Sequence, residues 1–331
     1  GLDSTEVRRK NYIKPSAFPL TTSMGAAYDS GEYEKALDMA LTASGYQALR
    51  AEQKARRDRG DVVQIGIGVA SYVETTNPMG SGEYGAVEIT NDGGAIVRTG
   101  SSSHGQGHHT SWAMIVSQKT GIPMDKIEFR FGDTDDIERG NGTGGSRSLQ
   151  VGGTAAQMAA ENVIEIARQK AADLLEAAPE DVVLDAATGA FHVVGSPRPS
   201  KTWAEIAIAS PVALFAEADF TPEGATFPFG THVSVVEVDT ETGSVAIVRH
   251  IACDDAGTIL NPLIVDGQVH GGVAQGIAQA LLEEVRYDDG GNPITSNLAD
   301  YAFITAAELP SFERIPMETP TPRNPLGAKG I

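Results

Sequence analysis

Cysteine is nearly absent from this chain, since Cys253 is the only one among 331 residues. A single thiol cannot form a disulfide within the chain, and it cannot supply the set of thiolates that holds an iron–sulfur cluster. We therefore expect a protein of a reducing compartment, with the cytoplasm as the default.

Positive charge is also scarce. Lys and Arg number 25 against 44 Asp and Glu, and the net charge of −19 argues against nucleic acid and anionic membranes as partners. No uncharged apolar run approaches the ~20 residues that span a bilayer, and the first residues are too polar for a signal peptide. The chain starts without methionine and stops at Ile331, so we expect it to be trimmed at both ends.

What is present is a mixture of helical and strand patterns. Residues 30–59 repeat apolar positions at helical spacing with a break at Gly45, and residues 155–177 predict a long helix. Further helices are expected at 201–209 and 266–282. Strands are expected at 62–73, 84–90, 95–99, 126–131, 182–194, 231–238 and 244–253. These patterns predict an α+β fold with mixed sheets packed against helices.

Two parts of the chain, residues 84–118 and 231–282, share one plan of hairpin, loop with Gly and Gln, and helix. We interpret this as a possible duplication of a β-β-α unit, and chance likeness between two hairpins is the alternative. If the unit is duplicated, Gln106 and Gln268 should open equivalent helices. Their Cα atoms should then lie within roughly 15 Å and face one ligand.

The first of these loops is the stretch around which the chain is organised. Gly105, Gln106 and Gly107 stand between a strand and a helix. Free N–H groups at a helix start attract anions, phosphates above all, and glycine lets a ligand approach the backbone. The alternative is an ordinary strand–loop–helix corner.

Two groups of residues could hold a metal. The histidines are His104, His108 and His109, and the acids are Asp133, Asp135, Asp136 and Glu138. The glycines between His104 and His108 would interrupt the helix that a zinc site with histidines four residues apart requires. The acids lack the spacing of a calcium-binding EF-hand loop. Hydrogen bonding of the imidazoles to loop backbone or to a phosphate, and capping by the acids, are the favoured interpretations.

A second glycine-rich stretch, residues 141–148, reads NGTGGSRS and leads into a helix. Its small and hydroxyl residues can cradle a phosphoester, and the planar fork of Arg147 matches phosphate oxygens. The P-loop lysine is absent, so nucleotide hydrolysis is not indicated. A flexible linker would not require an arginine between two serines.

Taken together, these motifs resemble the large subunit of molybdenum hydroxylases, the family of xanthine dehydrogenase, aldehyde oxidase and aerobic carbon monoxide dehydrogenase. The matching stretches are SHGQGHHT (103–110), GDTD (132–135), GTGGSRS (142–148), DGQVHGGVAQGI (266–277) and GAKGI (327–331). The residues of the GQGH and GDTD motifs are most similar to those of the bacterial carbon monoxide dehydrogenase-like branch.

The resemblance implies a molybdenum ion held by the dithiolene of a pyranopterin, in this branch commonly with a cytosine dinucleotide. The residues it assigns to this cofactor are Gly105, Gln106, Gly107, His108, Thr110, Thr143, Ser146, Arg147, Ser148, Asp266, Gln268, Lys329 and Gly330. The chain departs from the family at His109, where an acid is common. By the resemblance the catalytic glutamate lies two residues beyond Ile331, so no catalytic residue is assigned here.

The resemblance also divides the chain and implies partners. We expect a connector with helices (1–60), a first cofactor-binding subdomain (61–228) and a second one (229–331). Partners would be the upstream half of the subunit and subunits with iron–sulfur clusters and FAD, in a higher oligomer, and the fragment alone would be inactive. Two alternatives stay open, a non-catalytic binding module for an anionic nucleotide-like cofactor and a zinc enzyme using His104, His108 and His109.

Overall fold

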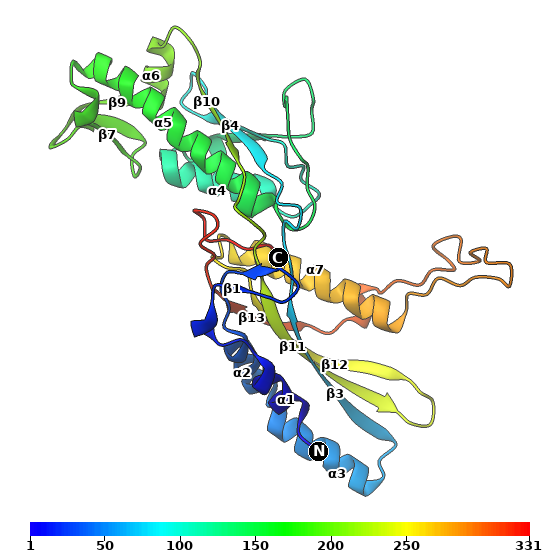
Figure 1. Ribbon diagram of the computed structural model, residues 1–331. Coiled ribbons are helices and arrows are strands. Elements are labelled where there is room, and N and C mark those ends of the chain that lie inside the picture. Colours follow the sequence, from blue (N-terminus) through cyan, green and yellow to red (C-terminus); the bar gives the residue numbers. More distant parts are fainter.

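The computed structural model describes residues 1–331, and its core consists of two four-stranded mixed sheets (Figure 1). The first sheet has the order β10-β4-β5-β6, with β4 (Glu83–Ile89), β5 (Ala95–Thr99), β6 (Ile127–Arg130) and β10 (Leu214–Phe220). The second has the order β13-β12-β11-β3, with β3 (Val63–Val73), β11 (Phe229–Asp239), β12 (Val245–Asp255) and β13 (Phe312–Met317). The predicted α+β class is therefore confirmed.

Helices cover these sheets. The main ones are α2 (Tyr33–Ser44), α3 (Tyr46–Arg59), α4 (His108–Thr120), α5 (Thr154–Leu175) and α7 (Pro262–Leu281). The remaining elements are α1 (Ser4–Asn11), α6 (Trp203–Ala209), β1 (Leu20–Thr21), β2 (Ala27–Tyr28), and a three-stranded sheet of β7 (Val182–Asp185), β8 (Ala190–Val193) and β9 (Ser196–Thr202). None of the helices combines the length and apolarity that a membrane span requires.

The two sheets repeat one connection. In each, an antiparallel hairpin is followed by a helix and then by a strand parallel to the second hairpin strand, as β4-β5-α4-β6 and as β11-β12-α7-β13. The fourth strand of each sheet is exchanged. β3 precedes β4 in the chain but pairs with β11, and β10 precedes β11 but pairs with β4. The topology thus supports the proposed duplication and extends the unit to β-β-α-β.

The strand exchange differs from the predicted division at residues 60 and 228. β3 falls within the predicted first subdomain, yet all its sheet hydrogen bonds place it in the second sheet. The two sheets are therefore tied together by crossing strands.

Small residues let the helices approach the first sheet closely. Ala156, Ala159 and Ala160 of α5 are fully buried against it. A Cβ on Gly85 of β4 would lie 2.6 Å from the backbone nitrogen of Ala156. In the second sheet, successive residues of β12 face opposite sides, so that Cys253 packs toward α2 and Ala252 toward α7.

Several element boundaries differ from the predictions. α6 starts at Trp203 because Thr202 and Glu205 form a capping box, and the residues before it belong to β9. α7 starts at Pro262, before the predicted Asp266, because the Asn261 side chain caps it. β13 was not predicted, since a strand that contains Pro316 gives a weak local signal.

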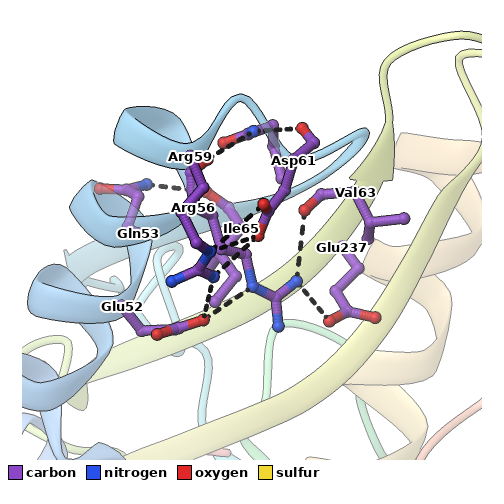
Figure 2. Close-up of polar contacts among 9 residues, drawn as sticks. Glu52, Gln53, Arg56, Arg59, Asp61, Val63, Ile65 and Glu237 are labelled. Atoms are coloured by element: carbon purple, nitrogen blue, oxygen red, sulfur yellow. Dashed lines mark hydrogen bonds and ion pairs between the residues drawn. The ribbon is translucent and has the colours of Figure 1, made fainter.

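Two of the three arginines in the last turn of α3 pair with neighbouring acids, as Figure 2 shows. Arg56 pairs with Glu52 at 3.1 Å and with Glu237 of β11 at 2.8 Å, and Arg59 pairs with Asp61 at 2.7 Å. This cluster therefore anchors α3 to the second sheet and is not an unpaired anion-binding patch.

A chain of polar side chains crosses the second sheet. Ser234 Oγ lies 2.8 Å from His250 Nδ1, His250 Nε2 lies 3.2 Å from His232 Nδ1, and His232 Nε2 lies 2.7 Å from Asp254 Oδ1. Tyr72 Oη also donates to Asp254 Oδ1, at 2.7 Å. Because a carboxylate only accepts, His232 Nε2 carries the proton of its contact with Asp254.

This row of hydrogen-bonded side chains makes the stability of the fold depend on pH. Burial, with a contribution from His232, lowers the pKa of His250 to about 4. In the unfolded chain, the His250 imidazole takes up a proton near pH ~6.5. The contribution of neutral His250 to the free energy of unfolding is therefore fully present above that pH, and on the order of 1–3 kcal/mol is lost as the pH falls toward about 4. Urea unfolding at pH ~7 and pH ~5 should show this loss. His250→Gln should reduce it, with exposed His104→Gln as the control, and an unchanged loss in His250→Gln would contradict the assignment.

Candidate functional site

A cavity of about 490 Å³ lies where the two repeated units meet. It is formed by the loop before α4, the loop before α5, the first turns of α7 and the last residues of the chain. Nine of the predicted site residues line it: Gly105, Gln106, His108, Thr143, Ser146, Ser148, Gln268, Lys329 and Gly330. The two Gly/Gln segments of the repeat therefore meet at one cavity.

The loop before α4 is braced by its own side chains. The Gln106 side chain accepts a hydrogen bond from the backbone N–H of His104 and lies within reach of the Ser102 carbonyl. Gly107 caps α4 with a φ of 79°, and a Cβ there would lie 2.8 Å from Cδ1 of Ile264 on α7. Glycine is therefore required for the conformation and for the close approach of the two units.

The expectation that Gln268 opens a helix is wrong. α7 begins at Pro262, and Asn261 Oδ1 accepts from the Ile264 N–H at 3.2 Å. Gln268 therefore reaches the cavity from the second turn of α7, where the partial positive charge of the helix N-terminus attracts an anion only weakly.

The loop before α5 is joined to the first loop. Thr143 Oγ1 donates to the Ser102 carbonyl at 2.6 Å and lies 3.1 Å from Ser148 Oγ. Ser146 has a φ of 50°, a left-handed conformation that is unusual for a residue with a Cβ. Such conformations turn backbone groups toward one side, as in anion-binding nests.

Arg147 does not take the predicted position on a phosphate. Its side chain is 6% exposed and its guanidinium pairs with fully buried Glu83 at 3.0 Å. It also donates to the carbonyls of Gly142 at 2.8 Å and Gly82 at 2.6 Å, and it is absent from the cavity wall. Arg147 turns inward because the buried Glu83 carboxylate is stable only with a charged partner. Its hydrogen bonds to Gly82 and Gly142 fix the conformation of the loop.

Three further residues assigned to the cofactor, Asp266, Gly107 and Thr110, do not line the cavity. Asp266 pairs with Arg314 of β13 and does not line the cavity. Gly107 and exposed Thr110 lie beside the cavity wall without being part of it. His109, at the position where the family often has an acid, packs against Phe129 with ring centroids 4.9 Å apart. It therefore serves the packing of α4 on the first sheet.

The histidines do not form a metal-ligand cluster. No group of three His, Cys, Asp or Glu side chains in the chain is placed to hold a metal ion. His108 lies against Trp112 with ring centroids 4.6 Å apart, and burial lowers the pKa of His108 to about 4. The zinc alternative therefore lacks its ligands, and His108 is a neutral imidazole near pH ~7.

Two ring nitrogens at the cavity have no partner within the chain. Nδ1 of His108 and Nε1 of Trp112 are buried and unpaired, and both residues line the cavity. Gly105 and Gly144 have open space where a Cβ would be. Hydroxyls, unpaired ring nitrogens and open backbone suit a polar, anionic group such as a pterin with phosphates.

Some cavity residues were not predicted as cofactor contacts. They are His104, Ser111, Trp112, Gly144, Leu149, Ile264, Val265 and Ile331. His104 and Gly144 belong to the recognised motifs. Ser111 and Trp112 follow on the face of α4 that carries His108, so helical spacing from His108 could have indicated them.

A larger cavity of about 920 Å³ lies further along α4 and has a different character. Apolar side chains make up much of its wall, including Met114, Met124 and Leu326, and none of the predicted site residues lines it. The polar chemistry therefore concentrates at the smaller cavity.

The Glu83–Arg147 pair leads to a stability prediction. Arg147→Met and Glu83→Gln should each lower the free energy of unfolding by about 3–5 kcal/mol, because each leaves a buried charge without its partner. Arg59→Gln, at an exposed pair, should cost less than about 1 kcal/mol. Chemical denaturation of the three variants measures the difference, and equal losses at the buried and exposed pairs would show that burial of the pair is unimportant.

Comparison with known proteins shows where this site belongs. Residues 39–310 match the molybdopterin cofactor-binding domain. The carbon monoxide dehydrogenase large chain of Hydrogenophaga pseudoflava is 39% identical over the whole chain, and the nicotine 6-hydroxylase large subunit of Paenarthrobacter nicotinovorans is 32% identical over 98% of it. The chain covers 43% and 42% of these relatives.

Solved structures agree in fold. Carbon monoxide dehydrogenase from Oligotropha carboxidovorans superposes with a TM-score of 0.91 at 37% identity, covering 100% of this chain and 44% of that one. Quinoline 2-oxidoreductase from Pseudomonas putida 86 gives 0.87 at 33% identity, covering 98% and 44%. The expected family is therefore confirmed: the chain belongs to the molybdopterin cofactor-binding domains, and it spans under half the length of the carbon monoxide dehydrogenase large chains to which it is similar.

Proposed function

We propose that the cavity between the two repeated units holds a molybdenum pyranopterin in its cytosine dinucleotide form. The observation that carries this proposal is the convergence of both Gly/Gln segments and the Thr143–Ser148 loop on one cavity with two unpaired ring nitrogens. When bound, the cofactor supplies redox chemistry that no side chain of this chain provides.

The cavity residues would divide the work of holding this cofactor. Gly105, Gln106 and His108 would contact the pterin, and Gln268 would form the facing wall. Thr143, Ser146 and Ser148 would contact the phosphates through hydroxyls and backbone N–H groups, because the nearby cation Arg147 is paired with Glu83. Trp112, buried behind His108, would exclude water from that side.

The whole protein would be a molybdenum-dependent hydroxylase or dehydrogenase. Its other parts would be the upstream half of the same subunit and subunits carrying iron–sulfur clusters and FAD, assembled as a cytoplasmic oligomer. The single cysteine among these 331 residues supports a placement of the clusters outside this part of the protein.

Metal and pterin analysis of the full-length protein tests the proposal. We expect molybdenum and pterin in equal amounts, and release of cytidine monophosphate when the cofactor is hydrolysed. Pterin without molybdenum would favour a non-catalytic binding module. Stoichiometric zinc with neither would contradict the proposal.

The isolated chain should oxidise no aldehyde, purine or carbon monoxide, even when folded, because it spans under half the length of these relatives. A dye-reduction assay with each substrate measures this, with the full-length enzyme as the positive control. Turnover by the isolated chain would show that the missing half is dispensable.

A further inference from the structure

The last eight residues, Asn324–Ile331, form a segment that we call the terminal strap. The Asn324 side chain donates to the Ala328 carbonyl at 2.8 Å, and the Gly327 carbonyl accepts from the Thr258 N–H at 2.9 Å. The Lys329 N–H donates to the Ala256 carbonyl at 2.9 Å. The strap is therefore laid along the residues that follow β12, and its end forms part of the cavity wall.

The side chain of Lys329, a residue of the cavity wall, is engaged by a buried carboxylate. Its Nζ lies 3.0 Å from Asp255 Oδ1, and both side chains have 0% exposure. The ammonium also lies 5.1 Å from the ring centroid of Phe229. Burial raises the pKa of Asp255, and Lys329 opposes this rise. Each buried charge therefore depends on the other, and the ammonium is committed to Asp255.

The strap also bears directly on the loop before α5. A Cβ on Gly330 would lie 2.6 Å from Cβ of Ser146 and 2.6 Å from Cγ2 of Thr76. Ser146 Oγ donates to the Ile331 carbonyl at 3.2 Å. A shift of the strap along its length would therefore displace Ser146, a residue of the cavity wall.

We propose that Lys329 and Asp255 are positioning residues. Their ion pair sets the register of the terminal strap, and the strap in turn holds Ser146 and Gly330 in the cavity wall. This inference rests on the proposed function for its ligand, and it replaces the expectation that the Lys329 ammonium contacts the cofactor. The cavity would then bind its anionic ligand without a lysine charge.

The two roles of Lys329 predict opposite results for one substitution. In the full-length enzyme, Asp255→Asn frees the ammonium. If Lys329 were a ligand, this variant would retain its pterin at least as well as the parent. A positioning role predicts that Asp255→Asn and Lys329→Met each lose pterin at least about tenfold faster during dialysis, since each leaves one charge buried alone.

The double variant Asp255→Asn/Lys329→Met completes the cycle. It removes both buried charges, so a positioning role predicts that it recovers most of the lost retention, to within about threefold of the parent. A ligand role predicts that it behaves like Lys329→Met. Exposed Lys54→Met, at an ion pair 2.5 Å long on α3, controls for the loss of a lysine. Retention of pterin at the parent's level by Asp255→Asn would overturn the proposal.

Gly330→Ala tests the strap without touching the ion pair. Its Cβ would press against Ser146, so pterin loss should also accelerate. Hydrogen exchange of residues 324–331 gives a readout that needs no cofactor, and it should rise in Asp255→Asn and return in the double variant. If the unsubstituted full-length protein contained no pterin, the proposed function would be refuted. The positioning role would still be supported if hydrogen exchange of residues 324–331 rose in Asp255→Asn and returned in the double variant.

Discussion

A buried carboxylate that faces a buried cation is the interaction on which both sides of the cavity depend. Glu83 and Arg147 hold the loop before α5, and Asp255 and Lys329 hold the terminal strap. In each case the cation comes from a stretch that the resemblance assigned to the cofactor, and the acid comes from one end of a core strand. The cations therefore shape the cavity, while hydroxyls, ring nitrogens and backbone groups face its interior.

The prediction from sequence succeeded where the signal was local. Gly45 separates α2 from α3 in a left-handed conformation, and the strands expected at 84–90 and 95–99 form the hairpin of β4 and β5. The anion-site reasoning pointed to the loops before α4 and α5, and both loops line the cavity, because glycine, serine and threonine in a loop before a helix act through nearby backbone.

The prediction failed where a distant partner decides the outcome. Local sequence suggests a phosphate contact for Arg147, but its actual partner Glu83 lies 64 positions away in the chain. Asp266 likewise pairs with Arg314, which lies 48 positions away. No spacing rule connects such residues. For the same reason the parallel addition of β13 to β12 and the membership of β3 in the second sheet could not be read from their own residues.

The exchange of strands also has a consequence for the order of folding. β3 is synthesised early, but its partner β11 follows far behind, and Thr76 and Thr226, which hydrogen-bond beside these strands, are 150 positions apart. Contacts so distant in sequence slow folding, because a long loop must close before they form. During synthesis β3 therefore remains an unpaired edge, the kind of segment that aggregates unless a chaperone or rapid collapse of the first sheet protects it.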